Sequence, residues 1–311
     1  MSILVVGSVA FDSIRTPHGS VDRCLGGAAT HFSLAASFFT LVRIIGVVGE
    51  DYTGKEQAVF KARGIDTQGI EQVPGKCFHW TGEYRDAMNE AHTLQTDLNV
   101  FQSFQPKIPE AYRDSQFLFL ANIDPVLQNK VRTAMPGVKM VCGDTMNYWI
   151  TGHRENLNTV LRGLDVLLIN DGEARLLSGE TNLLRAAEHI LASGPKTLIV
   201  KHGEYGATAF FGPESFAGSS RHRFFHAPAL PLADVVDPTG AGDSFAGGFF
   251  GYLASQPAVT PAVFRRAMFY GGVMGSFAVE RFGTERMQSL TREEIDRRFA
   301  TFRELSHLDT E

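Results

Sequence analysis

The feature that most constrains the fold of this chain is a regular alternation between short apolar runs and longer helical patterns. The runs are rich in β-branched residues and read ILVVGSV, LVRIIGVVG, FLFLANI, VKMVCGD, DVLLIN and KTLIVKHG in chain order. The first two are followed by helical patterns near 26–39 and 53–63, and the last third of the chain turns helical. This alternation predicts an α/β fold with a wide, mainly parallel and buried central sheet.

One segment, residues 76–104, interrupts the alternation. Two strand-like stretches, WTGEY and TLQTDLNVF, stand there without a helix between them. We predict a small antiparallel unit that forms a β lid over a cleft, together with part of residues 12–24. The aromatic side chains of this segment could stack on a ligand or form the core of the lid; they are Phe78, Trp80, Tyr84 and Phe101. No repeat or linker divides the chain, so residues 1–311 are expected to form a single domain.

Composition excludes several classes of protein. With 311 residues, 44% of them hydrophobic, the chain is long enough to bury a large core. The 29 Lys and Arg and the 34 Asp and Glu include no long basic run, so no nucleic acid partner is expected. Three cysteines lie far apart without CxxC spacing, which predicts neither a disulfide framework nor a zinc site. Because there is no membrane-length apolar run and no basic leader, we expect a soluble cytoplasmic protein with no membrane partner.

The segment DVVDPTGAGDSFAGGF, residues 234–249, carries the strongest chemical signal. ADVV is strand-like, DPT can turn the chain, and GAGD leads into a helix. We therefore expect the N–H groups of Ala241, Gly242 and Asp243 to be unpaired at a helix start, where the macrodipole is positive and anions bind. Gly240 and Gly242 lack a Cβ, so a phosphoryl group could approach the backbone there.

Asp243 needs a separate explanation, because a carboxylate beside a bound anion is repulsive. The role that fits is a general base, which accepts the proton of an attacking hydroxyl while the N–H groups stabilise the transferred phosphoryl group. The alternative is a favourable charge in the first turn of a helix, with the glycines closing a tight bend. The segment by itself leaves both explanations open.

Five motifs, in order along the chain, resemble those of the ribokinase-like (PfkB) family of carbohydrate and nucleoside kinases. DPTGAGD closely resembles the family's DTxGAGD, although Pro238 replaces the usual small polar residue. The other motifs are GSVAFD followed by GGAATHFSLAASFF, then GVVGEDYTG, NDGE and KHGEYG. Each is weak by itself, but the ordered set covers nearly the whole chain. The resemblance implies a ribokinase-like three-layer α/β/α fold and a magnesium-dependent kinase that transfers the γ-phosphoryl group of ATP to a hydroxyl.

The resemblance assigns the acceptor end of the site to residues near the N-terminus. Asp12, at the end of the first strand, would accept hydrogen bonds from two hydroxyls, with a turn-capping Asp as the alternative. Gly26 and Gly27 would lie against the sugar, or cap a helix. His31 stands where many members have Asn, and could hydrogen-bond a hydroxyl or pack within a helix.

Polar residues at the ends of later strands supply further candidates. Asp144 and Asn147 in DTMNYW are candidates for the acceptor pocket, with an ordinary turn as the alternative. By the resemblance, Asn170 and Glu173 in NDGE organise water around magnesium on the nucleotide phosphates. A helix cap is the other explanation for NDGE, and the two roles are compatible.

The resemblance places the nucleotide against glycine-rich turns. The nucleotide-binding candidates are Lys201, Gly203, Gly206, Thr239 and Gly283. For the three in KHGEYG, a plain glycine turn is an equally good explanation. Asp237 would bind a monovalent cation such as potassium or hold the anion-hole turn. RMQSL, which follows soon after Gly283, departs from the family's pattern at the cation site.

The sequence therefore predicts an ATP-dependent sugar kinase that phosphorylates a hydroxyl, most simply a CH2OH group, with Asp243 as general base and the backbone of 240–243 as anion hole. The alternatives are a nucleoside kinase of the adenosine or cytidine type, or a catalytically silent protein that binds sugar or nucleotide. The chain has neither GxxxxGK[ST] nor a complete GxGxxG after its first strand, which disfavours a P-loop kinase and a dinucleotide-binding enzyme. The expected partner is a small sugar or nucleoside, and the resemblance also allows a homodimer through the lid.

Overall fold

The computed structural model describes residues 1–85, 88–215 and 223–307, and within them a nine-stranded main sheet forms the centre of the molecule. In spatial order its strands are β13 (Phe224–Ala227), β12 (Ala207–Phe211), β11 (Thr197–Lys201), β10 (Val166–Asn170), β9 (Met140–Asp144), β8 (Phe117–Leu120), β1 (Ser2–Val6), β4 (Leu41–Val48) and β5 (Asp66–Gln72). The strands from β11 to β5 run parallel to one another, and β12 pairs antiparallel with both β11 and β13. The predicted wide, mainly parallel sheet is confirmed.

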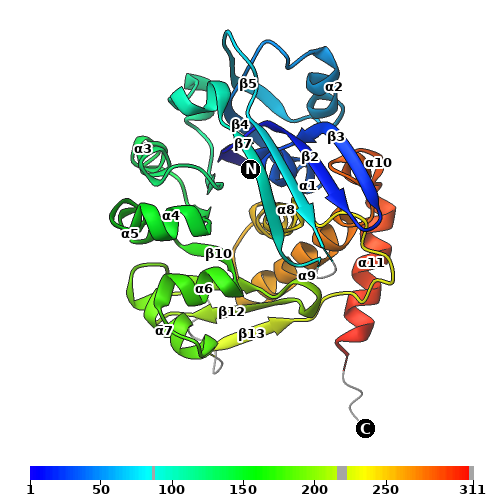
Figure 1. The fold of residues 1–311 in the computed structure, drawn as a ribbon. Coiled ribbons are helices and arrows are strands. Elements are labelled where there is room, and N and C mark those ends of the chain that lie inside the picture. The colour runs from blue at the N-terminus through cyan, green and yellow to red at the C-terminus, as the bar shows by residue number, and fades with distance from the viewer. Residues whose placement is uncertain (86–87, 216–222, 308–311) are drawn as a thin grey trace.

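Helices cover both faces of this sheet, because side chains alternate between the faces along each strand. In β1, Ile3 and Val5 pack into one core, whereas Leu4 and Val6 pack into the other. The first core is shared with α1 (Ala28–Ala36), α2 (Gly54–Ala62), α8 (Ala241–Ser255), α9 (Pro261–Ala278), α10 (Glu285–Ser289) and α11 (Arg292–Leu305). The second is shared with α3 (Pro125–Ala134), α4 (Asn147–Gly152), α5 (Arg154–Leu161), α6 (Asp171–Ser178) and α7 (Leu183–Ala192). The result is the three-layer α/β/α arrangement of Figure 1.

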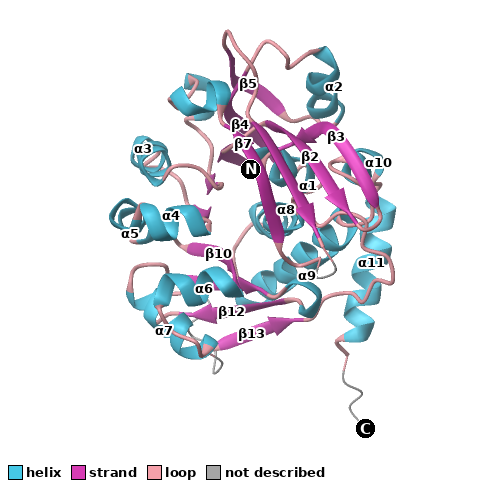
Figure 2. Ribbon diagram, in the orientation of Figure 1, coloured by secondary structure: helices cyan, strands magenta, loops and turns pink. Residues whose placement is uncertain are grey.

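A second sheet of four strands lies apart from the main sheet (Figure 2). Its spatial order is β3 (Gly19–Gly26), β2 (Ala10–Thr16), β6 (His79–Tyr84) and β7 (Ala91–Asp97). The pairs β2–β3 and β6–β7 are antiparallel, but β2 and β6 run parallel, so the predicted antiparallel unit is in fact a mixed sheet. Residues 86 and 87 of the predicted lid lie outside the described residues.

Two local predictions are wrong. Asp12 does not end the first strand: β1 stops at Val6, and Asp12 lies within β2 of the small sheet. The apolar run is interrupted at residues 7–9, where the chain leaves one sheet and enters the other. The segment 233–236, predicted as strand-like, forms no strand, although the Val236 N–H donates to the Val279 carbonyl at 2.8 Å.

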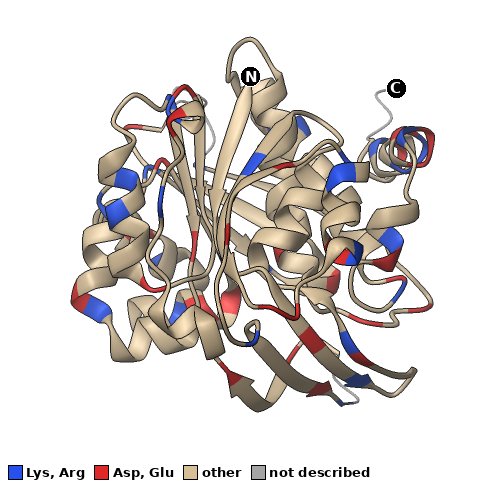
Figure 3. Cartoon of the chain, turned by 90° about the horizontal axis from the view of Figure 1, so that it is seen from above, with Lys and Arg blue, Asp and Glu red and all other residues tan. Residues whose placement is uncertain are grey.

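In the view of Figure 3, Lys and Arg are spread over separate elements and interspersed with Asp and Glu. In the described part of the chain, no helix has both the length and the apolar character needed to cross a bilayer.

Candidate active site

The carboxyl ends of three neighbouring strands meet the start of a long buried helix. β9 ends at Asp144, β10 at Asn170 and β11 at Lys201, and Asn170 and Lys201 are partners in the strand register. Because the carboxyl ends of parallel strands lie at one edge of the sheet, their last side chains gather there. Asp243 joins them from the first turn of α8.

Lys201 lies at the centre of this group. Its Nζ is 3.3 Å from Asp144 Oδ2, and a Cβ added to Gly242 would lie 3.0 Å from the same Nζ. Burial acts to lower the Lys201 pKa, but the carboxylates of Asp144, Glu173 and Asp243 outweigh it and the pKa is raised. The ammonium therefore stays charged beside the start of α8.

The carboxylates around Lys201 outnumber it. Burial, together with the charge of Asp144, raises the pKa of Asp243 to about 8 and that of Glu173 to about 7. Burial also raises the pKa of Asp144 itself, against the lowering effect of Lys201. One lysine does not neutralise three carboxylates, so this end of the site has a deficit of positive charge.

The backbone at the start of α8 offers two free donors rather than the three predicted. Gly240 is the N-cap and has a left-handed φ of 72°. The Ala241 N–H donates to the Pro238 carbonyl at 3.1 Å, so the expectation that it is unpaired is wrong. Among the described residues, the N–H groups of Gly242 and Asp243 have no protein acceptor, as expected in the first turn of a helix. An anion at this position would meet two N–H groups and the Lys201 ammonium.

Asp237 holds the turn that precedes the helix. Its side chain is fully buried, and its two carboxylate oxygens accept the N–H of Thr239 at 2.9 Å and of Gly283 at 2.8 Å. Gly283 has a φ of 55°, which favours glycine there. These bonds support the turn-holding role of Asp237 and tie residues 237–239 to the segment after α9.

Asp12 and His31 form the other end of the site. Asp12 is 5% exposed, and burial raises its pKa to about 7, although a hydrogen bond from the Gly27 backbone opposes the shift. A Cβ on Gly26 would lie 1.9 Å from Asp12 Oδ2, so only glycine allows this approach. Gly27, with a φ of 93°, is the N-cap of α1, which confirms the helix-cap interpretation.

His31 spans the distance between Asp12 and the helix start. Its Nε2 is 4.0 Å from Asp12 Oδ2, and a Cβ added to Gly240 would lie 2.3 Å from the His31 ring. Both ring nitrogens are buried and have no hydrogen-bond partner among the residues that the structure describes, and burial lowers the His31 pKa to about 4. A neutral imidazole with two unused polar atoms has the capacity to bind a hydroxyl.

Asn170 and Glu173 form a capping box at the start of α6. The Asn170 N–H donates to Glu173 Oε2 at 2.8 Å, and the Glu173 N–H donates to Asn170 Oδ1 at 2.7 Å. The helix-cap interpretation is therefore confirmed. Glu173 Oε1 accepts no hydrogen bond from the described protein residues. This oxygen therefore remains available to a ligand near Asp144 and Lys201.

Other candidates lie further from this cluster. Gly203 and Gly206 have φ of 57° and 99° and form the turn between β11 and β12, as the glycine-turn interpretation predicts. Asn147 is exposed at the first residue of α4, and no hydrogen bond joins its side chain to the other candidates among the described residues.

Most of the lid aromatics pack within the lid. Phe78 stacks on Phe101 at 5.4 Å, and Trp80 covers Gly82 and donates through Nε1 to Thr93 at 3.1 Å. Tyr84 differs, because its hydroxyl accepts a hydrogen bond from Thr239 Oγ1 at 3.2 Å. Sequence reasoning missed this contact, since no motif links residues 155 positions apart.

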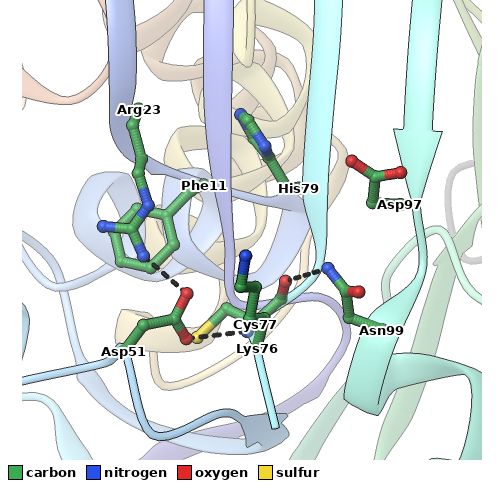
Figure 4. Close-up of a pocket in the computed structure, with 8 residues that line it drawn as sticks. All are labelled: Phe11, Arg23, Asp51, Lys76, Cys77, His79, Asp97 and Asn99. Carbon is green, nitrogen blue, oxygen red and sulfur yellow. Dashed lines mark hydrogen bonds and ion pairs between the residues drawn. The ribbon is translucent and has the colours of Figure 1, made fainter.

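A recess of about 600 Å³ lies beside the small sheet. Figure 4 shows the side chains that line it. It is lined by Phe11, Arg23, Asp51, Lys76, Cys77, His79, Asp97 and Asn99. Phe11 and His79 are register partners, as are Asp12 and Trp80, and neighbouring residues of a strand face opposite ways. The recess is therefore separate from the face that carries Asp12.

Comparisons with known proteins give the family. The sequence profile of the pfkB family carbohydrate kinases matches residues 2–291. A cytidine kinase of Thermococcus kodakarensis is 26% identical over 264 residues, which cover 83% of this chain and 90% of that protein. Among solved structures, the Burkholderia thailandensis nucleoside kinase in complex with inosine has a TM-score of 0.74 at 22% identity, with 96% of this chain and 98% of that chain covered. An E. coli protein assigned as a ribokinase II, solved with ATP and Mg2+, has a TM-score of 0.75 at 21% identity, with 98% and 99% covered. The chain therefore has a ribokinase-like fold.

Proposed function

Because the chain belongs to the pfkB family of carbohydrate kinases, we propose that it transfers the γ-phosphoryl group of ATP to a hydroxyl on the ribosyl group of a nucleoside. The observation that carries the proposal is the position of Asp243 beside two free N–H groups and Lys201, with Asp12 and His31 at the other end of the same site. The names of the relatives favour a nucleoside over the free sugar that the sequence suggested first. The alternative is phosphorylation of a free sugar, and the experiment must distinguish it from phosphorylation of a nucleoside.

In the proposed reaction, Asp12 and the neutral His31 hold hydroxyls of the acceptor. Asp243 accepts the proton of the reacting hydroxyl, whose oxygen forms a bond to the γ-phosphorus of ATP. The bond between that phosphorus and the bridging oxygen breaks, and ADP leaves with the electron pair. The N–H groups of Gly242 and Asp243, with the Lys201 ammonium, stabilise the charge on the transferred group.

The donor set fits magnesium. Asp144 and Glu173 are buried oxygen donors whose raised pKa values reflect burial and missing positive charge, and hard divalent cations prefer oxygen. A magnesium ion would neutralise charge on the nucleotide phosphates. Asn170 would orient Glu173 through the capping box, and Glu173 would act through metal-bound water.

Further residues are proposed to complete the nucleotide and acceptor pockets. Thr239, Gly203, Gly206 and Gly283 are proposed to border the nucleotide. Both carboxylate oxygens of Asp237 already accept backbone N–H groups, which favours the turn-holding role of Asp237 over a potassium site. Asn147 is proposed only as a residue at the edge of the acceptor pocket. A homodimer through the small sheet is proposed from the family resemblance.

The test is ADP release with magnesium-ATP across a panel of pyrimidine and purine nucleosides, pentoses and hexoses. We expect turnover with at least one nucleoside, with the product phosphorylated on the ribosyl CH2OH. The Asp243→Asn variant serves as the matched control for contaminating kinases. Turnover with free sugars alone would establish the sugar-kinase alternative, and no turnover with any compound would refute the proposal.

A further inference from the structure

Three contacts join the small sheet to residues around Asp237, just before the helix start that carries the free N–H groups. Thr16 Oγ1, at the end of β2, donates to the Val236 carbonyl at 2.9 Å. Thr239 Oγ1 donates to the Tyr84 hydroxyl at 3.2 Å. Cys24 packs on Gly283, since a Cβ on that glycine would lie 2.7 Å from Cys24 Sγ. All three contacts fall on residues bonded to Asp237 or next to it in sequence.

The Tyr84 contact reaches closest to the reacting groups. Tyr84 is the last residue of β6, and Thr239 directly precedes Gly240, the N-cap of α8. The Thr239 N–H is itself fixed by Asp237. One hydrogen bond and one peptide bond therefore connect the small sheet to the helix start, and the Asp237 hydrogen bond holds Thr239 between them. Burial raises the pKa of the Tyr84 phenol well above its usual range, so the hydroxyl stays neutral.

We propose that Tyr84 is a positioning residue that couples closure of the small sheet over the acceptor to the conformation of the 237–240 turn. This inference rests on the proposed kinase function and adds to it a residue outside the family motifs. With the hydrogen bond in place, the small sheet keeps Asp12 beside His31 while the N–H groups of Gly242 and Asp243 are held in position. Without it, the sheet opens more often, and water reaches the transferred phosphoryl group in place of the acceptor.

The geometry favours this role over a purely structural one. The Trp80–Thr93 hydrogen bond is of the same kind but lies wholly inside the small sheet. Loss of either bond removes one neutral hydrogen bond made by the small sheet. Only the Tyr84 bond connects this sheet to the 237–240 turn. The two bonds therefore form a matched pair, with Thr93→Val as the control for Tyr84→Phe.

The first measurement needs no ligand. Hydrogen–deuterium exchange of the amides in residues 236–243 reports the order of the turn in the free protein. Because a single neutral hydrogen bond contributes modestly, we expect Tyr84→Phe to speed this exchange by about three- to tenfold. Thr93→Val should leave it within about twofold of wild type. Equal exchange in Tyr84→Phe and wild type would overturn the proposal.

The second measurement is the ratio of ATP hydrolysis to phosphoryl transfer. Tyr84→Phe should lower kcat/KM for the acceptor by about three- to tenfold and raise this ratio, while KM for ATP stays within about twofold. Thr93→Val, which removes a hydrogen bond that lies wholly inside the small sheet, should keep the wild-type ratio. If the wild type is active and Tyr84→Phe has the same ratio of hydrolysis to transfer, the proposed coupling is wrong but the kinase function stands. A wild type without phosphoryl transfer refutes the kinase function, while the exchange result still decides whether Tyr84 orders the turn.

Discussion

The carboxylates at the two ends of the candidate site are held by different kinds of scaffold. Asp144 and Asp243 project from a strand end of the main sheet and from a helix packed on it. Asp12 projects from the four-stranded sheet, and His31 projects from α1 of the main body. The proposed phosphate end is therefore built within the main body, whereas the proposed acceptor end combines one residue of the small sheet with one of the main body. This difference suggests a division of labour in which one end performs chemistry and the other selects the acceptor.

The largest effect should come from the rigid end. Asp243→Asn removes the proposed base but keeps the shape of the side chain. We expect turnover to fall by about 10²- to 10⁴-fold, the usual range for a lost general base, while ATP affinity is unchanged. Steady-state kinetics and nucleotide titration measure the two quantities. Near-normal turnover would show that Asp243 is not the general base. It would then also contradict the proposal that one end of the site performs the chemistry while the other selects the acceptor.

The acceptor end should show a smaller and more selective effect. Asp12→Ala removes the carboxylate that is proposed to accept two charge-assisted hydrogen bonds from the acceptor; their loss should cost roughly 2–4 kcal/mol, or about 30- to 1000-fold in kcat/KM. Deoxy acceptors that lack one contacted hydroxyl should lose less in the variant than the parent acceptor does. If kcat/KM of Asp12→Ala stayed within about threefold of wild type for every acceptor, the hydroxyl-binding carboxylate would have to be another residue.

The raised pKa of Asp12 should make the free energy of unfolding depend on pH. Its folded pKa of about 7 lies well above the ordinary value for Asp, mainly because of burial, so folding favours the protonated form. Its stabilising contribution is full below about pH 4 and is lost as the pH rises through 7. Asp12→Asn lacks this titration, so its free energy of unfolding should gain on that of wild type between about pH 4 and about pH 8, by up to about 4 kcal/mol for a three-unit shift. Thermal unfolding of the ligand-free protein checks this, and a pH-independent difference would contradict it.

The smallest effect is expected at the proposed metal site. Glu173→Gln keeps the capping box through its side-chain oxygen but removes the charge next to Asp144. The magnesium concentration for half-maximal rate should rise by about tenfold, the lower end for a residue that acts through metal-bound water. The acceptor KM should change less than this. An unchanged magnesium profile would leave Glu173 as a helix cap alone.

The sequence predicts the phosphate end better than the acceptor end for a physical reason. GAGD and NDGE are local, because a helix start and a capping box depend on residues within one turn. Asp12 was misplaced because ILVVGSVAF looks like one apolar strand, and only tertiary packing determines that the chain changes sheets at residues 7–9. The Ala241 pairing was missed because it depends on the angle of the Pro238 carbonyl. The Lys201–Asp144 contact depends on strand order, which a single sequence does not encode locally.

The most direct test of the division of labour is acceptor binding measured without turnover. Isothermal titration of the best nucleoside acceptor into wild type, Asp243→Asn and Asp12→Ala separates binding from chemistry. The account predicts that Asp243→Asn binds the acceptor within about threefold of wild type despite its lost turnover, whereas Asp12→Ala binds at least about thirtyfold more weakly. Equal losses of acceptor affinity in the two variants would contradict the separation of the two ends.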